Sequence, residues 1–149
     1  MALKTIWCLS LFFTALALAP AMAHLLALPN EIGSLREQYL IVQQIYRGWA
    51  FLGILIIGAL LSTLALTIMV RKYSQTFVLT LIAFLCLAGA QVVFWTFTYP
   101  ANQQTQNWTV LPDTWQALRT QWEYSHAAGA GLSLVALVAL ILAVFVKAE

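Results

Sequence analysis

The sequence predicts an all-α integral membrane protein, a four-helix bundle in which helices two and four extend beyond the membrane on the outer side. Of its 149 residues 62% are apolar and only 8% are charged, whereas soluble domains carry about a quarter charged residues. Charge-free stretches of roughly 20 residues, enough to cross a hydrocarbon core of about 30 Å as a helix, recur along the chain. No strand-like alternation accompanies them. We therefore expect a single domain over residues 1–149 and exclude a nucleic-acid-binding protein, a disordered tail and a secreted disulfide scaffold.

The first predicted span covers about residues 5–28, by the length that a membrane crossing needs. Lys4, an apolar run and the small residues Ala21 and Ala23 before His24 also fit a signal peptide with its cleavage site. We take the segment as the first helix, with the signal peptide as the alternative.

The second span, about residues 48–70, is preceded by an outer extension over about residues 35–47, because a helix start signal comes well before the apolar run. Ser34 followed three residues later by Glu37 has the pattern of a capping box. Within the extension, Tyr39, Gln43 and Tyr46 follow one another at helical spacing and form one stripe. We expect this extension to be continuous with the span.

The third and fourth spans are predicted over about residues 77–99 and 127–146, again by length and lack of charge. Asp113, with Gln116 three residues on, predicts a cap that starts an outer extension over about residues 114–126. Trp115, Arg119 and Trp122 repeat the spacing of the first stripe. The repetition fits a duplicated helical hairpin, but any capped amphipathic helix that enters a membrane can carry aromatic residues at this spacing.

Basic residues predict the orientation, because they concentrate on the cytoplasmic side. With four spans both chain ends lie on one side, together with the turn that holds Arg71 and Lys72, and this side carries a formal charge of +3 against −1 for the other. The +3 side holds Lys4, Arg71, Lys72, Lys147 and Glu149, and the −1 side holds Arg36, Arg47, Arg119, Glu31, Glu37, Asp113 and Glu123. We therefore expect both termini to be cytoplasmic, in what we interpret as a bacterial inner membrane.

The residues that can carry chemistry are predicted at one depth near the outer face. His24 ends the first span and His126 begins the fourth, while Glu123 shares a helix face with His126 and lies four residues after Arg119. Ionisable groups at membrane depth usually face the bundle interior or a cavity. With the first stripe and with Trp95, Asn102 and Trp122, these residues predict one outward-facing pocket. Its members are His24, Tyr39, Gln43, Tyr46, Trp95, Asn102, Arg119, Trp122, Glu123 and His126.

Each of these residues also has an ordinary structural explanation. Aromatic residues gather at membrane interfaces because their rings are amphipathic, and Arg119 with Glu123 can be an exposed pair. A di-iron carboxylate site is excluded, because it needs two Glu-x-x-His pairs and the chain has one. Cys8 and Cys86 are expected to lie apart. We predict no cofactor, although His24, His126 and Glu123 suit a single metal ion, and the two histidines suit a haem.

Several motifs resemble the anthrone-oxygenase-like family of small four-helix membrane proteins, most of whose bacterial members have no known function. The matching residues in the first half are Ala23-His24, Leu28-Pro29, Tyr39, Val42-Gln43 and Tyr46. Those in the second half are Pro100, Asn102, Trp108, Trp115, Arg119, Trp122-Glu123 and His126. Many members have a basic residue one turn after the position of His126, where this chain has Gly129 or Ala130.

The resemblance implies an oxidoreductase that oxidises an activated methylene of a flat phenolic compound with dioxygen and no cofactor. It implies that His126, oriented by Glu123, acts as the base. Asn102, Gln43 or Tyr46 would bind the enolate oxygen, and Trp95 and Trp122 would stack on the rings.

The leading hypothesis is therefore a membrane protein with an outward-facing pocket for a flat apolar or quinonoid molecule, and whether it is an enzyme stays open. The alternatives are a non-catalytic accessory subunit that docks a membrane-protein partner and a haem or metal carrier. The expected partners are the lipid bilayer and a small aromatic ligand, without nucleic acid.

Overall fold

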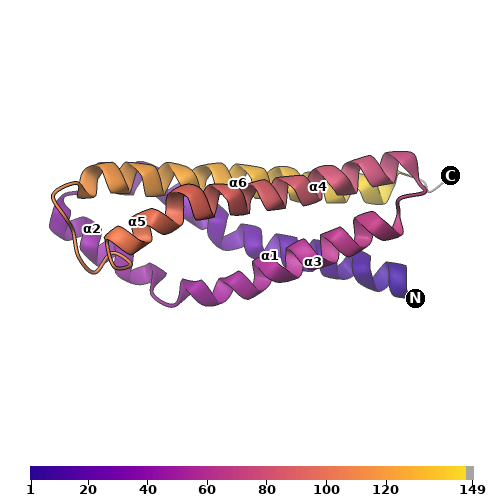
Figure 1. The fold of residues 1–149 in the computed structure, drawn as a ribbon, viewed down its shortest axis with the longest axis horizontal. Helices are drawn as coiled ribbons and strands as arrows, with labels where there is room; N and C mark the ends of the chain where they lie inside the picture. Colours follow the sequence, from indigo (N-terminus) through magenta and orange to yellow (C-terminus); the bar gives the residue numbers. More distant parts are fainter. Residues whose placement is uncertain (147–149) are drawn as a thin grey trace.

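The computed structural model describes residues 1–146, which form helices and no strands, as the sequence predicts. Figure 1 shows the helices running along one long axis. In chain order they are α1 (Ala2–Glu31), α2 (Arg36–Gln43), α3 (Gly53–Met69), α4 (Ser74–Val93), α5 (Tyr99–Gln104) and α6 (Trp115–Phe145). Three short turns join them: η1 (Gln44–Tyr46), η2 (Trp49–Leu52) and η3 (Phe94–Thr98).

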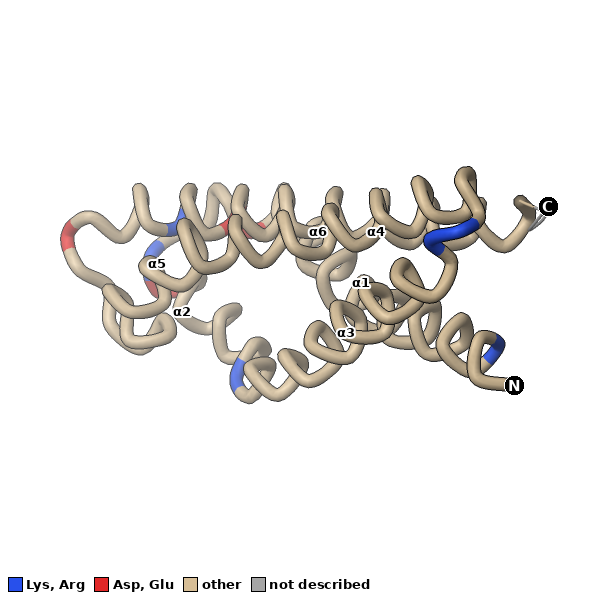
Figure 2. Tube along the Cα trace, turned by 45° about the vertical axis from the view of Figure 1, so that its right-hand side comes forward, with Lys and Arg blue, Asp and Glu red and all other residues tan. Residues whose placement is uncertain are grey.

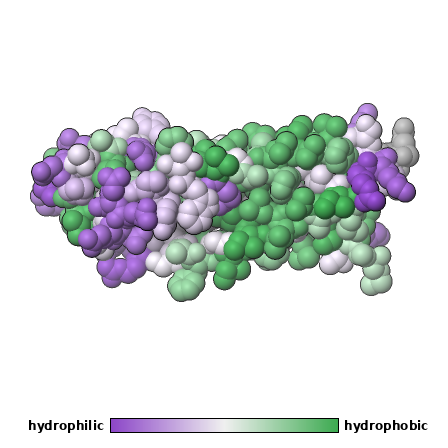
Figure 3. Space-filling model, in the orientation of Figure 1, coloured by the Kyte–Doolittle hydropathy of each residue, from purple (hydrophilic) through white to green (hydrophobic). Residues whose placement is uncertain are grey.

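The long helices form a ring of four, in which α1 and α4 each pack against both α3 and α6. Each is long and apolar enough to cross a membrane, over Ala2–Glu31, Trp49–Met69, Ser74–Gln104 and Trp115–Phe145. Figure 3 shows a broad apolar surface over the middle and right-hand part of this face, with polar residues gathered toward the end that holds α2 and α5 and in a smaller group at the opposite tip. The chain is therefore an integral membrane protein built as an all-α bundle.

The two ends of the bundle differ in charge. We call the end formed by α2, α5 and the first turns of α6 the cap end, and the opposite end, with the N-terminus and the α3–α4 turn, the turn end. In Figure 2 the acidic residues lie toward the cap end, and only basic residues mark the turn end. Lys147 and Glu149, which the sequence assigns to the same side as the N-terminus, lie outside the described residues.

Small residues let the helices approach within the membrane-spanning part. Ala59, Ala83, Ala136 and Ala139 are buried in its core together with Leu66, Val70, Leu87 and Leu140. At Gly58 of α3 an added Cβ would lie 2.7 Å from the ring of Phe13 on α1. Helix association in lipid relies on such close packing, because lipid tails are as apolar as the side chains.

The predicted extension before the second span is helical but is not continuous with that span, contrary to our expectation. Helix α2 ends at Gln43, and after η1 the chain turns at Gly48, whose φ of +87° suits glycine. The cap also differs from the prediction, because Leu35 precedes the helix and its N–H donates to Gln38 Oε1 at 3.2 Å. The hydroxyl of Ser34 instead donates to the carbonyl of Asn30.

The fourth helix does join extension and span, as the sequence predicts. Helix α6 has 31 residues, about 46 Å at 1.5 Å per residue, which exceeds the hydrocarbon core. It begins after Thr114, and no side chain caps it, so the predicted Asp113 cap is absent from the structure.

The third span continues past the proline at which we expected it to end. Pro100 cannot donate to the carbonyl of Thr96 and would clash with it in a regular α-helix. The chain accommodates this proline by widening into the π-turn η3, after which α5 carries the helix on to Gln104. Asn102 is thereby held on a helix instead of a loop.

Candidate functional site

Four elements of the cap end bring buried and half-buried polar side chains together. His24 and Glu31 come from the last turns of α1, Tyr39 from α2, Tyr46 from η1 and Glu123 from α6. His24 and Glu31 are seven residues apart, which is two helical turns, so they project from the same face. We call these five residues the carboxylate cluster.

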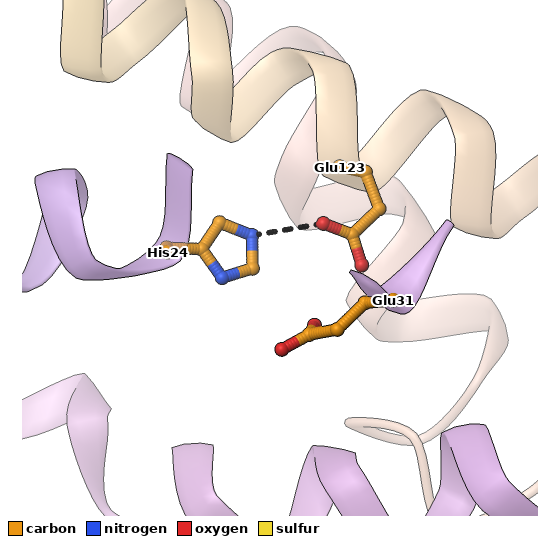
Figure 4. A group of neighbouring side chains, drawn as sticks. All are labelled: His24, Glu31 and Glu123. Carbon is orange, nitrogen blue, oxygen red and sulfur yellow. Dashed lines mark ion pairs between the residues drawn. The ribbon is translucent and has the colours of Figure 1, made fainter. Parts of the chain in front are cut away.

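Glu123 is fully buried and lies at the centre of this cluster. Tyr39 donates its hydroxyl proton to Oε1 at 2.9 Å, and Oε2 lies 3.3 Å from Nε2 of His24. Figure 4 shows the His24 ring pointing from α1 at this carboxylate, with the Glu31 carboxylate beside both. Within residues 1–146 this contact is the only close pairing of a carboxylate with a basic side chain.

Glu31 is also buried, at 5% exposure, and is bound to the cluster through Tyr46. The Tyr46 hydroxyl lies 3.1 and 3.3 Å from the two Glu31 oxygens and 2.8 Å from Nδ1 of His24. One ligand atom each from His24, Glu31 and Glu123 lie within 4.8 Å of one another. Two buried carboxylates and an imidazole therefore share a single site.

The two tyrosines are neutral donors to these carboxylates. Burial, and then the charge of Glu123, raise the pKa of Tyr39 above its ordinary value. Burial, and then the charge of Glu31, raise the pKa of Tyr46 in the same way. Both hydroxyls stay protonated, so each carboxylate has one fixed hydrogen-bond donor.

An aromatic layer covers one side of the cluster. The ring of His126 is only half-buried and lies edge-to-face on His24 and on Trp122, with ring centroids 4.5 Å apart in both pairs. The Trp122 indole N–H donates to Asn102 Oδ1 at 2.7 Å, which fixes its orientation. Among the described residues, none forms a hydrogen bond with the His126 side chain.

The contact between the two histidines bears on the haem alternative. A haem with two axial histidines needs both rings to point at one iron from opposite faces of the porphyrin. Here the rings touch at an interplanar angle of 66°. No space for a porphyrin lies between them, so the residues present do not fit a haem.

Arg119 and Trp108 close the cluster from the water side. The Arg119 guanidinium lies over the rings of Tyr39 and Trp115 and donates to the carbonyl of Ser34 at 2.7 Å. It does not form the ion pair with Glu123 that the spacing suggested. Trp108 is buried against Tyr39 and Trp122.

Most of the predicted site residues converge here, although not all in the expected roles. Glu123 pairs with His24 and not with His126, which we expected it to orient. Gln43 is buried, and its Nε2 has no hydrogen-bond partner in the part of the chain that the structure describes. Trp95 lies apart, because it is 60% exposed and its ring contacts only Phe94, edge-to-face, and Tyr99, at a tilt, among the rings of the described residues.

Sequence reasoning missed Glu31 and Trp108 as site residues. The spacing of seven between His24 and Glu31 was a signal that they share a face. Trp108 had no such signal, because it is positioned by three successive residues with positive φ, Gln106, Asn107 and Trp108. Such backbone costs about 1–2 kcal/mol per residue, and the burial of the indole offsets it.

A depression of about 430 Å³ lies at the turn end, away from this cluster. It is lined mainly by apolar residues of α1, of the α3–α4 turn and of the end of α6. The pocket that we expect at the cap end stays a prediction.

Comparisons of the chain with protein-family models, with curated proteins and with solved structures find no match.

Proposed function

We propose that this membrane protein binds a flat apolar or quinonoid molecule beside His126 and removes a proton from it, as in a cofactor-independent oxygenase of phenolic substrates. The observation that carries the proposal is the state of His126. Its imidazole is half-buried, lies against two aromatic rings and has no hydrogen-bond partner in the described chain. A neutral imidazole that is free to accept a proton is the usual general base.

The surroundings of His126 support a flat ligand. The rings of Trp122 and His24 both contact His126 edge-to-face, and aromatic side chains stack on flat molecules. Asn102 and Tyr46 are already engaged by hydrogen bonds, whereas Nε2 of the buried Gln43 has no hydrogen-bond partner among the described residues. Gln43 lies about one turn from both Tyr39 and Tyr46, so we assign it the role of donor to the enolate oxygen.

The chemistry balances without a further reactant. Loss of a proton from an activated methylene leaves an electron-rich carbanion, which reduces dioxygen. The methylene becomes a carbonyl that keeps one oxygen atom, and the other oxygen atom leaves as water. The four electrons that dioxygen accepts come from the substrate.

Oxygen uptake with an anthrone-type substrate tests the proposal on the purified full chain. We expect His126→Gln to lower turnover by about 100-fold or more, since general base catalysis contributes about 10²–10⁴. Tyr124→Phe, an exposed neighbour on α6, should keep parent turnover. Full activity in His126→Gln, or no uptake by a well-folded parent protein, would overturn the proposal.

We also propose an orientation of the bundle in the membrane. The basic turn end and the acidic cap end indicate that the cap end faces outward and both termini face the cytoplasm of a bacterial inner membrane. A reporter fused after Glu149 should therefore read cytoplasmic, and one inserted near Gln104 external. The reverse pattern would place the site on the wrong face.

A further inference from the structure

The carboxylate cluster contains more negative charge than its own residues neutralise. Glu31 and Glu123 are both at least nine-tenths buried, and buried carboxylates are costly unless a cation pairs with them. Arg119 is the nearest candidate, but it donates to a backbone carbonyl, and no carboxylate lies within ion-pair distance of it in the described chain. The cluster therefore needs added positive charge, which either a bound cation or extra protons can supply.

The hydrogen-bond network of the cluster also has too few protons for its contacts, which again indicates missing positive charge. The one proton of Tyr46 is donated to Glu31, so Nδ1 of His24 has to donate to the Tyr46 oxygen. A neutral imidazole carries only one proton, which leaves a lone pair on Nε2. That lone pair faces Oε2 of Glu123 at 3.3 Å. The reverse arrangement only moves the problem, because the Glu31 oxygens would then face Tyr46 without a proton between them.

Both atoms of this contact are buried, and neither has a hydrogen-bond partner among residues 1–146. His24 is 3% exposed and Glu123 is fully buried. Two electron-pair donors that face each other in a buried site are what a cation binds between. Glu31 supplies a third donor within 4.8 Å of the other two.

We propose that His24, Glu31 and Glu123 bind one divalent transition-metal ion at the cap end of the bundle. One imidazole nitrogen and two carboxylates suit Zn²⁺, Fe²⁺ or Mn²⁺, whereas Ca²⁺ and Mg²⁺ prefer oxygen ligands alone. Ligands on one such ion, at about 2.1 Å each, lie roughly 3–4 Å apart, so a carboxylate must move by the order of 1 Å.

The residues around the three ligands have the arrangement that metal sites use to orient their ligands. Metal-bound histidines usually engage their other nitrogen in a hydrogen bond, as His24 does with Tyr46 at 2.8 Å. Metal-bound carboxylates are likewise hydrogen-bonded, as Glu123 is by Tyr39. Three protein ligands leave at least one coordination position open, as in catalytic sites. This inference does not depend on the proposed oxygenase activity.

Titration with Co²⁺ tests the site on the full chain, purified in detergent and stripped with a chelator. We expect a visible absorption band that saturates at one Co²⁺ per chain, and Zn²⁺ should displace it. Glu31→Gln and Glu123→Gln should weaken Co²⁺ binding by about 100-fold or more, and Tyr46→Phe by about 10-fold, since outer partners of metal ligands are worth about 10–100-fold. Glu37→Gln should bind as the parent does.

If a variant does not fold, Co²⁺ binding by the parent protein still tests the proposed metal site. A parent chain that shows no Co²⁺ band and retains no stoichiometric metal overturns the proposal, and extra protons are then the counter-charge. Undiminished binding in the Glu31→Gln/Glu123→Gln double variant also overturns it. Because these readouts do not involve oxygen uptake, failure of the oxygenase proposal and failure of the metal site can be told apart.

Discussion

The cap end and the membrane-spanning part of this bundle are held together by different kinds of contact. In the membrane-spanning part, alanine, glycine and leucine pack closely, and the hydroxyls of Ser62, Thr67 and Thr80 bond to carbonyls of their own helices. At the cap end, large rings and buried charged groups from α1, α2 and α6 bond to one another across helices. The first part sets how closely the helices approach, whereas the second sets which side chains meet.

Of the substitutions that test this difference, Trp122→Ala at the cap end should lower the stability of the protein most. This residue is 4% exposed and contacts His24, Tyr46, Trp108 and His126. Trp122→Ala should lower the free energy of unfolding by about 3–5 kcal/mol, as is usual for loss of a buried Trp. Chemical unfolding in detergent, followed by helicity, measures the change.

Trp95 is the matched control for this prediction, because its ring is exposed. Trp95→Ala removes the edge-to-face contact with Phe94 and the tilted contact with Tyr99, which we expect to cost about 1 kcal/mol or less. If both substitutions lowered the free energy of unfolding equally, the buried aromatic layer at the cap end would stabilise the protein no more than an exposed tryptophan does.

The second-largest loss of stability should come from removing one hydroxyl group, that of Tyr39. Tyr39→Phe leaves Oε1 of Glu123 without its donor in a buried site, and hydrogen bonds to charged groups contribute about 2 kcal/mol. We expect a loss of that size in the same unfolding experiment. Tyr124→Phe, at an exposed tyrosine one residue after Glu123, should change nothing measurable, and a similar loss there would contradict the assignment.

The smallest predicted effect lies in the membrane-spanning part. At Gly58→Ala the added methyl group meets the Phe13 ring at 2.7 Å, and overpacking costs about 1–3 kcal/mol. We expect the lower end of this range, about 1 kcal/mol, because Phe13 is only half-buried and can shift. Gly53→Ala, where no atom lies within 4 Å, is the control, and thermal melting in detergent compares the two.

The sequence predicts the membrane-spanning part well, because length and lack of charge determine it directly. The four spans follow from charge-free stretches, and the shared depth of His24 and His126 follows from their places in the topology. Near the cap end, the conformational preferences of single residues determine where a helix breaks and where it continues. Gly48 breaks the second helix, and Pro100 is passed by a π-turn instead of ending the third.

The site was predicted less completely, because the direction of a side chain depends on how each helix is rotated. Trp95 and Asn102 were assigned to one pocket, but Trp95 lies within the widened turn η3 and is exposed, while Asn102 on the following helix reaches Trp122. Glu123 shares a face with His126 yet bonds to residues of α1 and α2. Glu31 was counted only as a charge, although its spacing from His24 placed it on the same face.

The central claim is that the polar groups of the cap end form one connected cluster, which is energetically separate from the packing in the membrane. A double-mutant cycle with Tyr46→Phe and Glu31→Gln, measured by unfolding in detergent with a chelator present, tests it most directly. We predict a coupling free energy of about 1 kcal/mol between these two contacting residues, whereas Tyr46→Phe and Gly58→Ala should add to within about 0.5 kcal/mol. Additive effects of Tyr46→Phe and Glu31→Gln would contradict the account, because the two side chains would then not share the bond on which the cluster depends.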